Sequence, residues 1–369
     1  MSKKIALAIE DDWELNGNGT GNVADLQYMP ARFLMNLAQR FGFKVSFMVE
    51  VLQQLAFRMY QDEDNELRLQ ADLWDSSVRQ MIHEGHDVQL HFHPQWCDAQ
   101  YENGHFILGG NWNIAKCPRE QRLEVIENSI QYLKDLLTPI TPNYELHSMK
   151  AGSWALQPSQ GILEDLERFG IKVVMGVGCG IYLESPTFRV DYRTLESPDN
   201  PYYPVYDDIC RVSTKREALV VLPLAYYHLG IRDIMARLCA SVGKRICRED
   251  NLDHFTNVPD AIRKLSPMGT QMRFQRLRPL DIAASPLGEM KRAIDGIVAR
   301  AMRSDLETVP VVLQSHTKRF KGNWKNLSRF FEYLTTRYGN VIEFATLSDI
   351  RPLLDKAAAF EGRECPLPD

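Results

Sequence analysis

Short apolar runs alternate with longer segments of helical period along most of the chain. The apolar runs predict strands at residues 4–10, 44–49, 87–92, 145–150, 172–177, 218–223, 309–314 and 341–345. Apolar positions that recur at every third or fourth residue predict helices at residues 29–41, 67–83, 118–137, 159–169, 289–304 and 324–338. This alternation is typical of βαβ units, in which helices join parallel strands. We therefore expect an α/β fold whose strands send their carboxyl ends to one face.

The predicted strand at 87–92 leads into two histidines, His91 and His93, that are separated by one residue. Because successive side chains of a strand point to opposite faces, both imidazoles project to the same side. Asp87 and Gln89 share that side, which makes it unusually polar for a buried strand. Two imidazoles on one face can bind one metal ion, although a hydrogen-bonded pair of surface histidines is the simpler alternative for so short a motif.

Two further strands end in groups that can carry chemistry. Asp11 and Asp12 follow the strand at 4–10, and the Gly- and Asn-rich segment 16–22 comes soon after, which indicates a loop rather than the start of a helix. In α/β folds the catalytic groups lie at such strand ends, where one carboxylate can bind a cation while its neighbour moves a proton. His316 follows the strand at 309–314 and has a side chain suited to general acid or base catalysis.

The order of these motifs resembles that of the polysaccharide deacetylase family, the NodB-homology carbohydrate esterases. The resemblance covers most of residues 4–350 and rests on Asp11-Asp12 and on segments 85–94, 150–154 and 313–316. It implies a distorted (β/α) barrel of the NodB-homology type that removes the acyl group from an N-acylated sugar. It also implies a set of roles: catalytic base, Asp11; ligands of a divalent ion, with Zn²⁺ the first candidate, Asp12, His91 and His93; general acid, His316; charge support, Lys150.

Three positions depart from the family pattern. Trp13 stands where a glycine usually follows the Asp pair, the two histidines are closer together than usual, and Lys150 replaces an arginine that supports the catalytic aspartate. Lysine donates to a carboxylate but lacks the planar fork of arginine. Two alternatives therefore stay open: an amidohydrolase or PHP-type phosphoesterase, since both use two histidines at a strand end, and a sugar-binding relative without catalytic activity.

Aromatic residues near these motifs are candidates for the substrate site. Tyrosine and tryptophan rings stack on sugar rings, and tyrosine hydroxyl groups donate hydrogen bonds. The candidates are Trp96 and Trp154, which follow two of the motifs, and Tyr202, Tyr203 and Asp207 in the aromatic and acidic loop at 198–208. The alternatives are a packed surface loop for the second group and core positions for the two tryptophans.

The composition is that of a soluble enzyme. The chain has 369 residues, 44% of them hydrophobic and 25% charged, which suffices for one barrel-sized domain over residues 1–369. Neither a signal peptide nor a transmembrane run is apparent, and the seven cysteines form no CxxC pair, so we expect free thiols in the cytoplasm. The substrate would then be a precursor of surface-polysaccharide biosynthesis, such as a nucleotide- or lipid-linked acylated sugar.

A predominantly helical insertion is expected at about residues 230–288. From residue 229 to 305 the chain has 14 Lys and Arg but 9 Asp and Glu, a net charge of +5, whereas the whole chain carries −5. Three clustered arginines, Arg273, Arg276 and Arg278, are candidates for binding a substrate phosphate, against the alternative of a solvated surface. The acidic whole chain makes nucleic acid an unsuitable partner. Homo-oligomer formation stays open.

Overall fold

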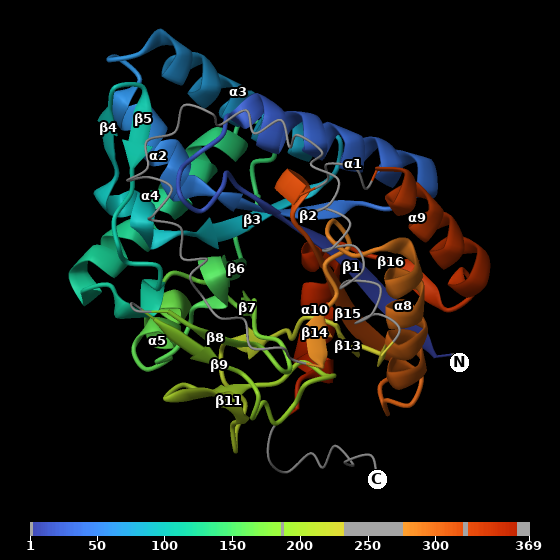
Figure 1. Cartoon of the computed structure of the whole chain (residues 1–369). Helices are drawn as coiled ribbons and strands as arrows, with labels where there is room; N and C mark the ends of the chain where they lie inside the picture. The colour runs from blue at the N-terminus through green and yellow to red at the C-terminus, as the bar shows by residue number, and fades with distance from the viewer. Residues whose placement is uncertain (1–2, 186–187, 232–275, 320–323, 360–369) are drawn as a thin grey trace.

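A parallel sheet forms the centre of the molecule. The computed structural model describes residues 3–185, 188–231, 276–319 and 324–359. Eight strands make up the sheet, and every pair of neighbours in it is parallel (Figure 1). Their order is β12 (Val220–Val221), β7 (Val173–Met175), β6 (Ser148–Ala151), β3 (Asp87–Phe92), β2 (Val45–Glu50), β1 (Lys4–Trp13) and β15 (Thr308–Ser315), with β16 (Ile342–Phe344) also beside β1.

The two edges of this strand row approach each other. Ala225, shortly after β12, donates its amide hydrogen to the carbonyl oxygen of Val312 in β15 at 3.0 Å. The sheet therefore curves into a distorted barrel, and the predicted α/β barrel-like fold is confirmed.

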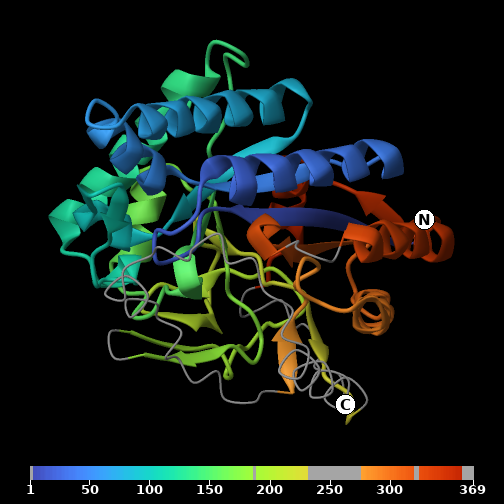
Figure 2. The same cartoon turned by 45° about the horizontal axis from the view of Figure 1, so that its top comes forward.

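Helices follow the strands in the predicted way. They are α1 (Met29–Phe41), α2 (Val51–Tyr60), α3 (Asn65–His83), α4 (Arg119–Leu137), α5 (Ile162–Arg168), α8 (Leu287–Ala301), α9 (Trp324–Tyr338) and α10 (Leu347–Ala357). Figures 1 and 2 show α1 and α3 on the same side of the sheet. Among the helices of the described segments, none combines the length and the apolar character needed to span a membrane.

Two of these helices were not predicted, and each has a physical reason. Helix α2 begins directly after β2 without turn residues; its first turn is capped by Glu50, which accepts a hydrogen bond from the Leu52 amide at 2.9 Å. Helix α10 contains Pro352, a residue that usually ends a helix. A capping box between Thr346 and Asp349 starts α10. All eight predicted strands and all six predicted helices are present, with each boundary within three residues.

Short antiparallel strand pairs lie outside the sheet. They are β4 (Gln100–Glu102) with β5 (His105–Ile107), β8 (Tyr182–Glu184) with β9 (Arg189–Asp191), β10 (Pro204–Val205) with β11 (Asp208–Val212), and β13 (Tyr226–His228) with β14 (Leu277–Pro279). Strand β14 lies inside the segment 230–288 that was predicted to be mostly helical, and the described residues 276–286 of that segment form this strand and turns rather than a helix, with Arg278 in β14. Residues 232–275, and Arg273 with them, lie outside the described residues, so the helical character of that segment and its role in phosphate binding stay predictions.

The two faces of β1 meet different surroundings. Ile5, Leu7 and Ile9 belong to the large apolar core that includes the helices, whereas Ala6 and Ala8 belong to a smaller cluster that also contains residues of α10. We call the face that bears Ala6 and Ala8 the inner face of the sheet. Since side chains alternate along a strand, this parity fixes which of the later polar residues of β1 point inward.

A buried histidine, His86, immediately precedes β3. The amide of Val45 donates a hydrogen bond to Nδ1 of His86 at 3.0 Å, so the imidazole has to keep a free lone pair in the folded state. Burial, assisted by the nearby Lys44 ammonium group, lowers the pKa of His86 from 6.5 to about 4.

This shift predicts a loss of stability in mild acid. Between pH 6.5 and about 4 the unfolded chain binds a proton at His86 that the folded chain excludes, so the free energy of unfolding falls as the pH falls. The contribution is at most about 3 kcal/mol. We expect urea unfolding of the wild type to show a steeper decline over this range than that of His86→Asn, whose side chain does not titrate. Parallel declines for the two proteins would contradict the assignment.

Candidate active site at the carboxyl ends of the strands

The inner face of β1 continues into a row of acids. Glu10 and Asp12 lie on the same face as Ala6 and Ala8, and Glu14 follows with the same parity just after the strand. All three carboxylates are buried. Such a row is costly to bury unless cations pair with it, so the partners of these acids define the site.

Lys150 is the first of these partners and is fully buried at the end of β6. Its Nζ lies 2.6 Å from Oε1 of Glu10 and 2.8 Å from Oδ1 of Asp12. Burial raises the pKa of Glu10 even though Lys150 opposes this shift. Burial acts on Asp12 in the same direction, but the charges of Lys150, His91 and His316 outweigh it and hold the pKa of Asp12 well below its usual range. Asp12 is therefore the ionised member of the pair.

His316 is the second cation beside Asp12. Its Nε2 lies 3.1 Å from Oδ2 of Asp12, and its Nδ1 lies 2.9 Å from Oδ2 of Asp281. Burial disfavours the charged imidazolium, yet the two carboxylates prevail and raise the pKa of His316 to about 9. The imidazole thus carries a proton at neutral pH and is oriented from both ends.

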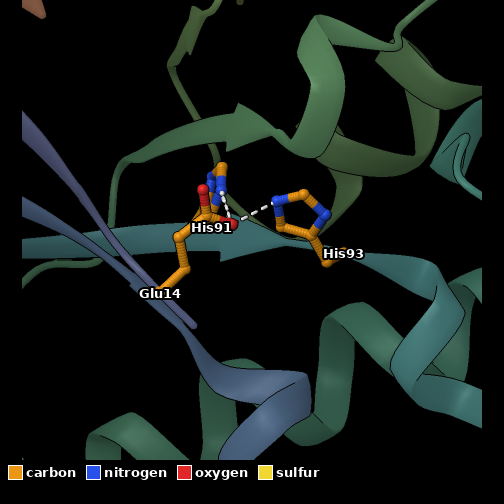
Figure 3. A group of neighbouring side chains, drawn as sticks. All are labelled: Glu14, His91 and His93. Carbon is orange, nitrogen blue, oxygen red and sulfur yellow. Dashed lines mark ion pairs between the residues drawn. The ribbon is translucent and has the colours of Figure 1, made fainter. Parts of the chain in front are cut away.

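Glu14 connects His91 of β3 with His93, which follows the end of that strand. Its Oε2 lies 2.5 Å from Nε2 of His93 and 3.5 Å from Nε2 of His91, and Figure 3 shows the carboxylate between the two rings. The other oxygen, Oε1, accepts a hydrogen bond from Nζ of Lys318 at 2.6 Å. Burial opposes ionisation, but His93 and Lys318 hold the pKa of Glu14 well below its usual value.

The atoms of this group fit a divalent metal ion. Nδ1 of His91 lies 3.0 Å from the carbonyl oxygen of Lys150; because a carbonyl only accepts, that nitrogen carries the proton and Nε2 keeps its lone pair. Nε2 of His91 is buried and has no hydrogen-bond partner. Two imidazole nitrogens and one carboxylate oxygen are a ligand set typical of catalytic Zn²⁺, and a backbone carbonyl behind a ligand histidine is a common second contact.

A cavity of about 660 Å³ opens over these residues. Asp12, Glu14, His93 and His316 contribute to its wall from the strand ends. The remaining lining residues include two tryptophans, several loop amides and hydroxyls, and two cations: Asn16, Asn18, Thr20, Trp112, Ser153, Trp154, Phe188, Lys318 and Arg319. Aromatic surface next to amide and hydroxyl groups is a surface that suits a polar ring such as a sugar.

Most of the residues predicted to be catalytic or metal-binding come together in this place. Asp12, His91, His93, Lys150 and His316 lie within the connected set of contacts described above. Among the predicted substrate residues, Trp154 lines the cavity. These positions support the predicted site, while the role of each residue stays a proposal.

Asp11 does not join this cluster. It has the opposite parity to Asp12, as does Trp13, whose ring lies 5.3 Å from that of Trp74 in the core on the helix side of the sheet. Asp11 is fully buried, and burial raises its pKa to about 7 against the opposing effect of the Ser315 and Thr317 hydroxyl groups. A pKa near 7 would suit a general base, but Asp11 is not among the residues that line the cavity.

Four predicted substrate residues also lie away from the cavity. Trp96 packs in the apolar core with its ring 5.2 Å from that of Phe106. Tyr202 and Tyr203 are buried, and the Tyr202 hydroxyl donates to the carbonyl of Ile209. Asp207 is exposed on the loop between β10 and β11. The structure therefore uses these aromatic residues for packing, because backbone pairing draws the loop at 198–208 against the barrel.

The sequence motifs did not identify several residues of the site. Glu14 was within reach, because it follows Asp12 by two positions and a strand extended to residue 13 keeps the same parity. Asp281 gave no signal, since the segment that carries it follows residues 232–275 and is placed by a bridge to Gln314 of β15. Trp112, Lys318 and Arg319 come from loops and turns, whose positions no periodicity indicates.

The comparisons with known proteins find similarity to solved structures only. No family model matches the chain, and no curated protein matches it. Among solved structures it is similar to a putative polysaccharide deacetylase from Mycobacterium smegmatis, with 12% identity, a TM-score of 0.49, and coverage of 100% of this chain and 96% of that chain. It is also similar to a probable polysaccharide deacetylase from Pseudomonas aeruginosa PAO1, with 13% identity, a TM-score of 0.46, and coverage of 95% of this chain and 90% of that chain.

A third similar structure is an enzyme of another activity, a 4-alpha-glucanotransferase from Thermococcus litoralis, with 15% identity, a TM-score of 0.48, and coverage of 95% of this chain and 40% of that chain. All three TM-scores lie below 0.5, and the proteins named have different activities. The activity of this chain therefore has to be inferred from its own side chains.

The geometry predicts which carboxylate holds a divalent ion. Glu14, rather than Asp12, lies between the two imidazoles. We therefore expect Glu14→Gln to lower the affinity for Zn²⁺ by more than about 100-fold, which exceeds the usual effect of removing a group that only hydrogen-bonds to a metal ligand. Asp12→Asn should keep most of the affinity. Calorimetric titration with Zn²⁺ measures both. Loss of the ion in Asp12→Asn together with retention in Glu14→Gln would support the ligand set expected from the sequence motifs.

Gly152 provides a second test of the same group. A Cβ atom at this position would lie 2.5 Å from Nδ1 of His93 and within 2.7 Å of two ring carbons, so a larger residue has to push the imidazole away. We expect Gly152→Ala to cost about 1–3 kcal/mol of unfolding free energy and to weaken Zn²⁺ binding. Unchanged affinity and stability would show that the ring of His93 is not held in this position.

Proposed function

We propose that this protein is a metal-dependent hydrolase that removes the acyl group from an N-acylated amino sugar. The observation that carries the proposal is the contact of an ionised Asp12 with a protonated His316, 3.1 Å apart, at the wall of a cavity shared with the His91, His93 and Glu14 group. Hydrolysis of an amide needs a base for water, an acid for the departing nitrogen and stabilisation of the developing oxyanion. The cavity offers groups for all three.

Asp12 is the proposed base. It is ionised and faces the cavity, and Lys150 fixes its position. Its low pKa makes it a weak acceptor for a proton of free water, so the water has to be made more acidic. Zn²⁺ or a similar ion held by Glu14, His91 and His93 would supply that acidity and would polarise the acyl carbonyl. Asp12 takes one proton as the water oxygen bonds to the acyl carbon.

His316 is the proposed acid. It holds a proton at neutral pH, and Asp281 orients its ring through Nδ1, so Nε2 is the nitrogen that faces Asp12 and the cavity. When the carbon–nitrogen bond breaks, His316 transfers this proton to the amine nitrogen. The products are a carboxylic acid and an amino sugar, and the proton on Asp12 leaves with the solvent or returns to the imidazole. Lys150 keeps the buried charge balanced throughout.

The substrate class follows from the cavity wall. Trp112 and Trp154 offer ring surfaces, and Asn16, Asn18 and Thr20 offer hydrogen-bonding groups that match hydroxyls. Within this proposal the sugar belongs to a cytoplasmic precursor of surface-polysaccharide biosynthesis, nucleotide- or lipid-linked.

The two alternatives have less support. The phosphoesterase and amidohydrolase sites considered above need further metal-binding histidines. In the described segments the candidate ligand groups are two that share Glu14: one with His91 and His93, the other with Asp12 and His316. A sugar-binding protein without activity has no need to bury an acid–base pair, since such a pair costs desolvation energy that sugar binding does not repay.

The reaction can be tested on simple substrates. We expect the Zn²⁺-loaded protein to release free amine from N-acetylated amino sugars, detected with an amine-reactive dye. His316→Gln should lower kcat by about two to four orders of magnitude, the range for loss of a general acid. Asp281→Asn, which misorients the ring and removes one of the two carboxylates that raise the pKa of His316, should lower kcat by about 100-fold. Zn²⁺ affinity should persist in both variants; full activity of His316→Gln would remove it from the mechanism.

A further inference from the structure

Arg319 occupies a position in the cavity that the proposed reaction does not use. It ends the short turn Thr317–Arg319 after β15, where its amide donates to the carbonyl oxygen of His316 at 2.8 Å. Its side chain is 47% exposed and lines the cavity. The backbone bond ties this residue to the catalytic histidine, so its side chain emerges at a fixed place beside the acid.

The charges around the cavity leave Arg319 weakly paired. Asp12 has Lys150 and His316 as partners, and Glu14 has Lys318 and His93. The carboxylate next to Arg319 is Asp281, whose Oδ2 already accepts a hydrogen bond from Nδ1 of His316 at 2.9 Å, while Nη1 of the guanidinium group stays 3.5 Å from the same oxygen. That distance is at the outer limit of a hydrogen bond.

A guanidinium group carries five N–H donors in a planar fork that matches a carboxylate or a phosphate. With one long contact among the described residues, Arg319 keeps most of these donors available at the cavity wall. A divalent ion at Glu14, His91 and His93 would add to the positive charge of the cavity. Such a field favours an anionic ligand over a neutral one of the same shape.

The position of Arg319 also indicates which part of the ligand carries the charge. Arg319 and His316 contact the same oxygen of Asp281, so the guanidinium lies on the side of the proposed general acid. The acid faces the departing nitrogen, which belongs to the sugar rather than to the acyl group. An anion bound by Arg319 would therefore sit on the amine-bearing sugar.

We propose that the substrate is an N-acyl amino sugar with an anionic substituent, a carboxylate or a phosphate, on the sugar side of the amide, and that Arg319 binds this substituent. The inference rests on the proposed function and narrows its substrate class. It assigns substrate recognition to a residue of the barrel itself, separate from the arginines at 273–278.

The test compares three probes: N-acetylglucosamine, its 6-phosphate, and the corresponding uronic acid with a carboxylate. We expect the Zn²⁺-loaded wild type to prefer one anionic probe over the neutral sugar by at least about 10-fold in kcat/KM. Arg319→Gln should lower kcat/KM for that probe by about 10- to 100-fold, mostly through KM, which corresponds to one charge-assisted pair. The loss on the neutral probe should be much smaller. Whichever anion shows the effect identifies the substituent.

The matched control is Arg337→Gln on α9, since that arginine has a similar exposure of 57% and lies outside the cavity lining. This variant should leave the kcat/KM values for all three probes unchanged. Equal kcat/KM for the three probes in the wild type would overturn the inference. An equal loss of kcat on all probes in Arg319→Gln would also overturn it, because that pattern belongs to a residue that only positions Asp281.

Failure of the proposed function gives a different result. If the wild type hydrolyses none of the probes, the inference is decided by calorimetric binding of the same three sugars. Tighter binding of an anionic probe that disappears in Arg319→Gln would support the anion site without the reaction. Equal or absent binding of all three would overturn the anion site as well.

Discussion

One fully buried lysine, Lys150, contacts two buried carboxyl groups in the interior of the barrel. Lys150 bridges Glu10 and Asp12 from β6, which β3 and β2 separate from β1 in the sheet. Removing one partner of such a buried pair typically costs about 3–5 kcal/mol, because the charge that is left behind stays desolvated. The bridge also keeps Asp12 ionised beside His316. Stability and the proposed reaction therefore depend on the same contact.

Strand alternation decides which acids reach that contact. Ala6 and Ala8 face inward, so Glu10, Asp12 and Glu14 do so too, while Asp11 points toward the helices. A shift of one residue moves a side chain to the opposite face of a sheet. The Asp11-Asp12 motif alone cannot show this, because a strand end can turn either way. The continuation of β1 to Trp13, which packs on Trp74, fixes the parity and moves the proposed base to Asp12 and the proposed metal carboxylate to Glu14.

The sequence allowed the sheet, most of its helices and half of the site to be predicted. Apolar runs located the strands, and the spacing of His91 and His93 placed both imidazoles on one face. Contacts between distant segments could not be predicted. Asp281 reaches His316 because β14 pairs with β13 and a further bridge joins Asp281 to Gln314. Tyr202 and Tyr203 looked suited to a sugar, but the pairing of Tyr202 with Val221 draws them into the interior.

The most direct measurement is the turnover of two neighbouring variants, Asp11→Asn and Asp12→Asn, on an N-acetylated amino sugar. Both changes remove one carboxylate from β1 while conserving its shape; they differ in the face from which it is lost, and Asp12→Asn also removes a charged partner of Lys150. The account predicts that Asp12→Asn lowers kcat by about two to four orders of magnitude, whereas Asp11→Asn stays within about tenfold of the wild type. The reverse pattern, with Asp11→Asn inactive and Asp12→Asn active, would contradict it.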